Sequence, residues 1–180
     1  THEEDMQIVY NSLKSNMITK VGIGYDVHKF KKGKYVKIFG IKIPHSHSLL
    51  GHSDADVGIH SLMDSILGAL TQGDIGKHFP SNSNEWKNAD SSILLKKVYN
   101  ILKVMNSEII HTDTNIICEK PIIKNYIPSM QKNISRILKL NVANISIKAT
   151  TTEKLGYLGR KEGIASQTIT TIKVLKKYNE

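Results

Sequence analysis

The sequence has a single cysteine, Cys118, in 180 residues. A lone cysteine cannot form an internal disulfide, and it excludes a zinc finger built from several cysteines. The chain therefore fits a reducing compartment. Long apolar runs are also lacking, because stretches such as Ser65–Leu70 fall far short of the ~20 residues that a membrane-spanning helix needs. We expect no membrane partner.

Acidic residues are outnumbered by basic ones, which gives the chain a formal net charge of +9. A basic surface could bind nucleic acid, but that function usually needs a concentrated patch. The lysines here are scattered, with short clusters at Lys29–Lys34 and Lys173–Lys177. We therefore expect no nucleic-acid partner. A phosphorylated small-molecule substrate explains the charge better.

The length and the hydrophobic content of 39% allow one globular domain with a real core. No internal repeat or low-complexity tract interrupts it. We expect residues 1–20 to form an N-terminal extension or linker, since they lack the apolar region of a signal peptide. Residues 21–180 then form the domain.

Runs rich in β-branched residues predict strands, several of which alternate apolar with polar positions. They are Lys20–Gly24, Tyr35–Phe39, Ile41–Ile43, Ile109–Cys118, Asn144–Ala149 and Ile164–Val174. Apolar positions at helical spacing predict helices over Val57–Leu70, Ser91–Met105 and Tyr126–Leu138. Loops are expected at Pro44–Gly51, Gly73–Lys87 and Glu153–Gly163. The fold class is α+β, with a mixed β-sheet covered on one face by helices.

The stretch GIGYDVHKF places Asp26 and His28 two residues apart, beside Gly22 and Gly24. In a strand, residues at this spacing point to the same face. We expect the carboxylate and the imidazole to project together from the end of a strand. That geometry suits a metal ion, and it equally suits an ion pair on a wet surface.

The stretch HSDADVGIH at 52–60 concentrates polar groups at the start of a predicted helix. Asp64 follows His60 by four residues, so the two share a helix face. Taken alone, the segment is better explained by acidic capping of the helix and an ordinary histidine, because acidic residues are common at helix starts. Taken together, Asp26, His28 and His60 form a three-ligand set that leaves one tetrahedral position open, as in catalytic zinc sites.

The stretch KATTTEKLGYLGR at 148–160 ends a predicted strand in three threonines, whose hydroxyls suit phosphate oxygens. A carboxylate beside a phosphate site, here Glu153, commonly holds Mg²⁺. A helix capping box is the alternative. The glycines of GDIG at 73–76 allow a ligand to approach the backbone, or they end the preceding helix.

The chain resembles the 2-C-methyl-D-erythritol 2,4-cyclodiphosphate synthase family of the non-mevalonate isoprenoid pathway. The matching stretches run in family order from about Val21 to Lys176. They are GYDVH (24–28), LLGHSDADVGIH (49–60), GDIGKHFP (73–80), NADS (88–91) and KATTTEKLGYLGR (148–160).

The resemblance implies an enzyme that converts 4-diphosphocytidyl-2-C-methyl-D-erythritol 2-phosphate to the cyclic diphosphate and releases CMP. The 2-phosphate attacks the β-phosphorus, so two anions must be brought together and no strong base is needed. Asp26, His28 and His60 match the zinc ligands of the family. Glu153 matches the family residue that holds Mg²⁺ or Mn²⁺, and His52 and Thr151 match the catalytic residues that stabilise the phosphates.

The resemblance also implies a homotrimer with active sites between subunits and a central cavity that can hold an isoprenoid diphosphate. Substrate contacts are matched by Ser53, Asp64, Asp74, Ile75, Gly76, Cys118, Lys120, Lys124, Thr150 and Thr152. The cavity lining is matched by Tyr25, Trp86, Tyr157 and Arg160. Interface packing without a regulatory ligand is the alternative for the cavity.

Two positions depart from the family pattern. Ile122 stands where members commonly carry lysine, with Lys120 and Lys124 nearby, and Ser81 replaces a common aspartate. Two other functions share these residues: a zinc-dependent phosphohydrolase, which would give a linear product, and a non-catalytic diphosphate-binding protein.

The composition, rich in Lys, Asn and Ile, and the N-terminal segment favour a plastid enzyme whose transit peptide has been removed. A bacterium with an AT-rich genome would give a similar composition, so the bacterial cytoplasm is the alternative location.

Overall fold

The structure is a computed structural model that describes residues 2–7, 16–86 and 88–176. Residues 1, 8–15, 87 and 177–180 lie outside the described residues, and with them lie much of the expected N-terminal extension and the end of the Lys173–Lys177 cluster. Residues 2–7 are helical. Among the described helices, none is long and apolar enough to cross a membrane.

A five-stranded sheet forms the centre of the domain, with the strand order β4-β1-β7-β5-β6. The β5–β6 pair is parallel and the other pairs are antiparallel, so the sheet is mixed, as expected. Its strands are β1 (Met17–Lys32), β4 (His47–Leu49), β5 (Glu108–Ile117), β6 (Ile145–Thr150) and β7 (Gly163–Leu175). The strands β2 (Tyr35–Ile38) and β3 (Ile41–Pro44) form a separate hairpin.

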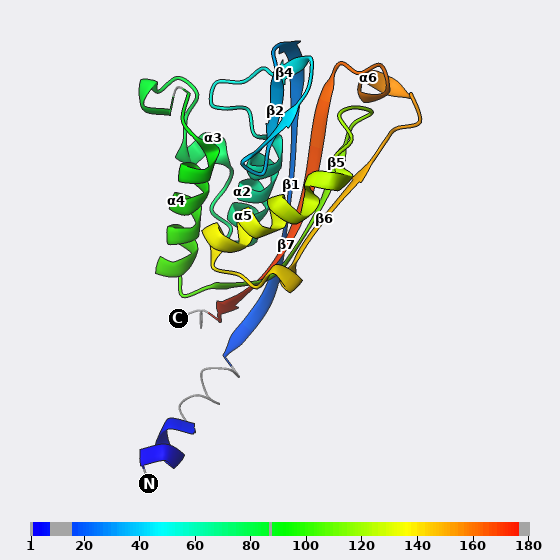
Figure 1. Ribbon diagram of the computed structural model, residues 1–180. Helices are drawn as coiled ribbons and strands as arrows, with labels where there is room; N and C mark the ends of the chain where they lie inside the picture. Colours follow the sequence, from blue (N-terminus) through cyan, green and yellow to red (C-terminus); the bar gives the residue numbers. More distant parts are fainter. Residues whose placement is uncertain (1, 8–15, 87, 177–180) are drawn as a thin grey trace.

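Three helices lie on one side of this sheet, which confirms the α+β class (Figure 1). They are α2 (Val57–Ala69), α4 (Ser91–Val104) and α5 (Ile127–Leu138). Two shorter helices are α3 (Ile75–His78) and α6 (Gly156–Gly159), and 3₁₀ turns occur at Asn84–Trp86, Lys124–Tyr126 and Val142–Asn144. The apolar core lies between the long helices and the sheet.

The three segments expected as loops all contain regular structure, so those predictions are wrong in detail. Strand β4 lies within Pro44–Gly51, helix α3 within Gly73–Lys87, and helix α6 within Glu153–Gly163. Strand β1 is also longer than expected. It begins at Met17 and pairs with β7 from that residue onward, so residues 17–20 belong to the sheet.

Helix α2 packs unusually close to the sheet because small residues line both sides of the contact. A Cβ atom added at Gly24 would lie 1.9 Å from the carbonyl oxygen of Ser61. The hydroxyl of Ser61 meets that of Thr168 on β7 at 2.9 Å, and both residues are fully buried. This close approach brings the first turns of α2 against the middle of β1.

The β2–β3 hairpin is fixed to the start of α2 by the buried carboxylate of Asp56. This carboxylate accepts backbone N–H groups of Phe39 at 2.7 Å, Gly40 at 2.6 Å and Ile59 at 3.0 Å. Burial raises the pKa of Asp56, and these three donors work against that rise. The hairpin therefore has a defined position beside α2.

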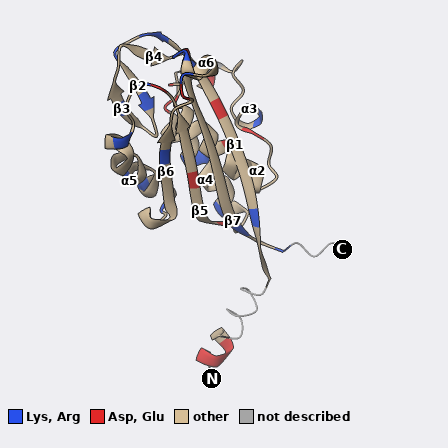
Figure 2. Cartoon of the chain, turned by 90° about the vertical axis from the view of Figure 1, so that its right-hand side faces the viewer, with Lys and Arg blue, Asp and Glu red and all other residues tan. Residues whose placement is uncertain are grey.

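The sheet face that carries no long helix is turned toward the viewer in Figure 2. On β1, Val21 is 63% exposed and Ile23 is 61% exposed, although both are large and apolar. Ile169 of β7 is 45% exposed on the neighbouring strand. Strand β7 carries one charged residue, Lys173. The part of this face formed by β1 and the middle of β7 is therefore apolar and uncovered in the single chain.

Candidate active site

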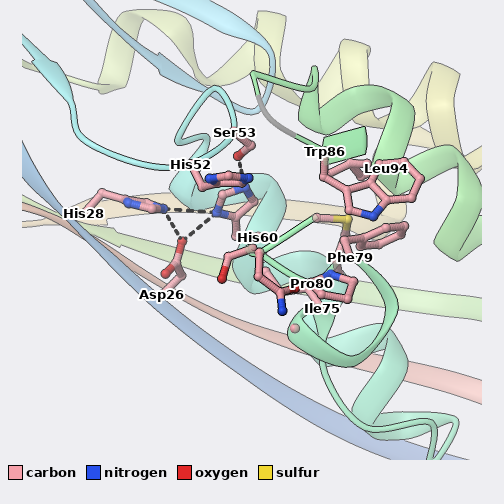
Figure 3. Close-up of a pocket in the computed structure, with 14 residues that line it drawn as sticks. Asp26, His28, His52, Ser53, His60, Ile75, Phe79, Pro80, Trp86 and Leu94 are labelled. Atoms are coloured by element: carbon pink, nitrogen blue, oxygen red, sulfur yellow. Dashed lines mark hydrogen bonds and ion pairs between the residues drawn. The ribbon is translucent and has the colours of Figure 1, made fainter. Parts of the chain in front are cut away.

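Asp26 and His28 lie inside strand β1 and not at its end, because the strand continues to Lys32. The expected placement at a strand end is therefore wrong. The expected shared face is confirmed, since the carboxylate and the imidazole both point toward α2 (Figure 3). The strand pairing with β7 continues through both residues, opposite Ser166 and Ile164, so their backbone is held by the sheet.

His60, in the first turns of α2, completes the group. Its Nδ1 lies 2.9 Å from Asp26 Oδ2 and 3.1 Å from His28 Nε2. His28 Nε2 lies 2.9 Å from the same carboxylate oxygen. One ligand atom from each of the three residues therefore converges on a common point, and all lie within 4.8 Å of one another. The set of one carboxylate and two imidazoles fits a metal ion.

The far ring nitrogens of both histidines are engaged by the protein. His28 Nδ1 donates to the carbonyl oxygen of Leu50 at 2.8 Å. His60 Nε2 lies 3.0 Å from Ser91 Oγ and 3.1 Å from Ser53 Oγ. Partners of this kind fix the tautomer, so that the opposite nitrogen keeps its lone pair for a ligand.

Charges within the triad shift the ionisation of its members. Burial alone would raise the pKa of Asp26, but its close contacts with His28 and His60 outweigh burial and hold the pKa well below its ordinary value. Burial would lower the pKa of His28, and the contact with Asp26 outweighs it, so the pKa is raised. The carboxylate is therefore ionised and ready to bind a cation.

The triad opens into a pocket of about 550 Å³. His52 and Ser53 border it near the triad, and Phe79 and Leu94 give it an apolar wall (Figure 3). Trp86, which the resemblance assigns to the central cavity, lines this pocket in the single chain and packs edge-on against Phe79 at 5.3 Å between ring centroids. The remaining lining residues are Met63, Ile75, Gly76, Pro80, Ser81 and Asn82.

The GDIG segment forms the rim of this pocket through helix α3. Asp74 caps α3 by accepting from the Lys77 N–H at 2.9 Å. Asp64, on α2, accepts from the Ile75 N–H at 2.8 Å, and burial raises its pKa. The two carboxylates thus position the rim. Ile75 and Gly76 border the cavity itself.

A second pocket of about 390 Å³ lies where β5 and β6 end. Within the described part of the chain, no lining residue is common to both pockets. Lys120 is absent from the lining. The lining residues are Cys118, Glu119, Pro121, Ile122, Ile123, Lys124, Ala149, Thr150 and Thr151.

The loop after β6 does not form the helix capping box that was the alternative interpretation of this segment. Thr151 Oγ1 donates to Glu153 at 3.1 Å, but Glu153 and Lys154 have positive φ angles of 52° and 65°, and so they do not begin a helix. Glu119 holds the loop by accepting from the N–H groups of Thr152 at 3.0 Å and Lys154 at 3.2 Å. Exposed threonine hydroxyls and the Glu153 carboxylate are left facing solvent.

Two of the residues expected at the central cavity are in contact. The hydroxyl groups of Tyr25 and Tyr157 lie 2.7 Å apart, and burial together with this hydrogen bond raises the pKa of Tyr25 to about 12. Arg160 follows directly after α6 and pairs with Glu162 at 2.7 Å.

Comparisons with known proteins agree with this geometry. The model of the YgbB family matches residues 19–173. The chain is 51% identical over 160 residues to the 2-C-methyl-D-erythritol 2,4-cyclodiphosphate synthase of Clostridioides difficile, covering 89% of this chain and 99% of that protein. The chain belongs to the YgbB family.

Solved structures of similar proteins support the assignment of this chain to the YgbB family. The bifunctional IspDF from Campylobacter jejuni has a TM-score of 0.85 at 40% identity, covering 88% of this chain and 43% of that one. A complex of IspF from Plasmodium falciparum with CDP has a TM-score of 0.76 at 36% identity, covering 88% of this chain and 97% of that one.

The sequence did not indicate several residues of this YgbB-family site that hold other site residues in position. Glu119 anchors the threonine loop, and Lys37 forms an ion pair with Asp54 at 2.6 Å behind His60. Ser91 was expected only as the first residue of a predicted helix, yet its hydroxyl reaches His60. The signal for Ser91 was present in the NADS stretch, but nothing local indicated what the side chain would contact.

Proposed function

We propose that the protein is a 2-C-methyl-D-erythritol 2,4-cyclodiphosphate synthase. It would convert 4-diphosphocytidyl-2-C-methyl-D-erythritol 2-phosphate to the 2,4-cyclodiphosphate and release CMP by intramolecular phosphoryl attack. The observation that carries the proposal is the convergence of Asp26, His28 and His60 at the mouth of a 550 Å³ pocket. The 51% identity to a protein of that name supports it.

The metal at the triad is proposed to be Zn²⁺, with Asp26, His28 and His60 as ligands. Two imidazoles and one carboxylate are a donor set typical of catalytic zinc. Bound there, the ion would act as a Lewis acid that reduces the negative charge on the reacting phosphate. The engaged far nitrogens of both histidines support this role, because they present the opposite nitrogens to the ion.

The second cation, Mg²⁺ or Mn²⁺, is assigned to Glu153. Its carboxylate is exposed and adjoins Thr151, whose hydroxyl would bind phosphate oxygens once it is released from Glu153. His52 borders the triad pocket and would donate a hydrogen bond to the phosphate that reacts. These residues hold and orient two anions, which is the main barrier to the reaction.

The two pockets are proposed to bind opposite ends of the substrate. The triad pocket, with Ser53, Ile75 and Gly76 in its lining, would take the methylerythritol end, and Asp64 and Asp74 would shape its rim. The second pocket would take the cytidine diphosphate, since the IspF structure of Plasmodium falciparum is described as a CDP complex. The lining residues assigned to this substrate contact are Cys118, Lys124 and Thr150. Lys120 and Thr152 adjoin lining residues in the chain and are assigned as further contacts.

A homotrimer is proposed to bring the two pockets together from neighbouring subunits. The uncovered sheet face supports assembly, because Val21, Ile23 and Ile169 would be buried by a second copy. Tyr25, Tyr157 and Arg160 would then lie near the central axis, where a cationic side chain and hydroxyl groups suit an isoprenoid diphosphate. The location is proposed to be the bacterial cytoplasm, the alternative to a plastid, because the 51% identical relative is bacterial.

Phosphorus NMR of the purified protein with the proposed substrate and Mg²⁺ tests the function. We expect the cyclic diphosphate and CMP, lost when a zinc chelator is added and lost in Asp26→Ala. A linear phosphate would identify a hydrolase instead. Substrate binding without turnover, with zinc retained, would identify a binding protein.

A further inference from the structure

Behind the triad, a line of buried polar groups reaches the far side of His60. His60 Nε2 lies 3.0 Å from Ser91 Oγ, and the Ser91 hydroxyl donates a hydrogen bond to Asp54 Oδ1. Asp54 Oδ2 accepts from Lys37 Nζ at 2.6 Å. The four groups come from α2, the start of α4, the loop before α2 and strand β2.

The hydrogen atoms in this line can be placed by elementary rules. An ionised carboxylate accepts only, so the Ser91 hydroxyl must donate to Asp54. With its one hydrogen committed, Ser91 Oγ can only accept from His60, which requires the proton of the imidazole to lie on Nε2. The lone pair then remains on Nδ1, the nitrogen that faces Asp26 at 2.9 Å.

We propose that Lys37, Asp54 and Ser91 form a relay that positions His60 as a metal ligand by fixing both its tautomer and the plane of its ring. The inference rests on the proposed metal-dependent function. Ser91 is a positioning residue in this account, because it acts through His60 and does not line the pocket. Lys37 neutralises Asp54 and keeps its carboxylate directed at Ser91.

The relay is built as a rigid unit. Ser91 is fully buried, and the side chains of Lys37 and Asp54 are only 14% and 17% exposed. Lys37 also pairs at 3.2 Å with Asp90, the N-cap of α4, and the Ser91 N–H donates to Asp54 at 3.1 Å. Each charged group therefore has more than one partner that fixes its position.

Ser53 Oγ also lies within hydrogen-bonding distance of His60 Nε2, at 3.1 Å. The proposal therefore has to distinguish the role of Ser91 from that of Ser53. Ser53 is half-buried and borders the pocket, and its hydroxyl is not directed by a carboxylate in the described structure. Ser53 could therefore donate to His60 Nε2 as readily as it accepts, and would not fix the tautomer alone. Removing Ser91 should affect the metal site more than removing Ser53.

The test is the zinc affinity of the full chain, measured by competition with a chromophoric chelator. For Ser91→Ala we expect affinity ~10- to 100-fold weaker than wild type, the range for loss of a partner behind a metal-bound histidine. The visible spectrum of the Co²⁺ form should also change. Ser65→Ala is the matched control, because Ser65 is a buried α2 serine that bonds Thr170 at 2.6 Å, away from the triad.

Lys37→Met is the second variant, and it remains informative if Ser91→Ala fails to fold. It should also weaken zinc binding, whereas Lys42→Met should not, since Lys42 lies opposite Lys37 in the hairpin but stacks on Tyr35. Wild-type protein that binds no zinc would overturn the proposed metal site. Wild-type binding with Ser91→Ala and Lys37→Met both within twofold of it, and an unchanged Co²⁺ spectrum, would overturn the relay.

Discussion

Cys118 illustrates how burial alone can decide the chemistry of one side chain. Burial, followed by the nearby charge of Glu119, raises the pKa of its thiol to about 12. The thiolate is the reactive form, and an exposed thiol titrates near ~8.5. We therefore predict that, at pH 8, iodoacetamide modifies Cys118 roughly a thousandfold more slowly in the folded protein than in the unfolded chain.

The same shift gives a pH dependence of stability. As pH rises through ~8.5, the unfolded chain releases the thiol proton, while the folded chain keeps it until about pH 12. The stabilising contribution is thus complete only at lower pH, and it is lost progressively toward pH 12. Unfolding measured in urea should show this decline in wild type and less of it in Cys118→Ala. Rapid modification of folded protein at pH 8 would contradict the account.

At the scale of elements, the contact between β1 and α2 sets the geometry of the triad. Asp26 and His28 belong to one element and His60 to the other, so any change in their spacing separates the ligand atoms. We predict that Gly24→Ala lowers the free energy of unfolding by about 1–3 kcal/mol or more, since overpacking forces the backbone to shift. The added Cβ would lie 1.9 Å from the Ser61 carbonyl oxygen.

Gly68→Ala on the same helix is the matched control. Its added Cβ would lie 3.7 Å from the Ile23 carbonyl oxygen, which is an ordinary contact. Because alanine is the better helix former, this change should stabilise the protein by about 0.5–1 kcal/mol. Thermal unfolding of both variants measures the difference. If Gly24→Ala and Gly68→Ala changed the stability and the zinc affinity by equal amounts, the close packing of β1 and α2 would not determine the geometry of the triad.

The long elements were predictable from sequence because hydrophobic periodicity over ten or more residues reports a buried face. Strand β4 and helices α3 and α6 were not, since three or four residues carry no period. The interior position of Asp26 and His28 was missed because charged residues mark strand ends more often than strand middles. Here their side chains lie on the same face of β1 and meet His60 of α2.

Some residues of the candidate site could likewise be predicted from the sequence, and others could not. Asp26, His28 and His60 were found because their local spacing and motif are visible in the chain. Lys37 and Glu119 were not, since their roles depend on which loops the fold brings beside them. The place of Trp86 in the pocket wall was not predicted either, because its packing against Phe79 depends on how the fold arranges the loop that carries both residues.

For the whole molecule, the uncovered sheet face is the feature that the single chain does not explain. We predict that Ile23→Glu prevents assembly, because it would place a charge in an apolar interface without a partner. Light scattering after gel filtration should give a trimer for wild type and a monomer for the variant. Ile93→Glu is the control, since Ile93 is also 55% exposed but lies on α4. A trimeric Ile23→Glu would exclude this face as the interface.

If the active site is shared between subunits, two inactive variants should complement one another. His60→Ala damages the triad pocket, and Thr151→Ala damages the second pocket. In trimers formed by refolding an equal mixture, about one quarter of sites would receive an intact half from each chain by random assembly. We therefore expect cyclase activity in the mixture and almost none in either variant alone. A mixture as inactive as its components would place both halves of the site in one chain.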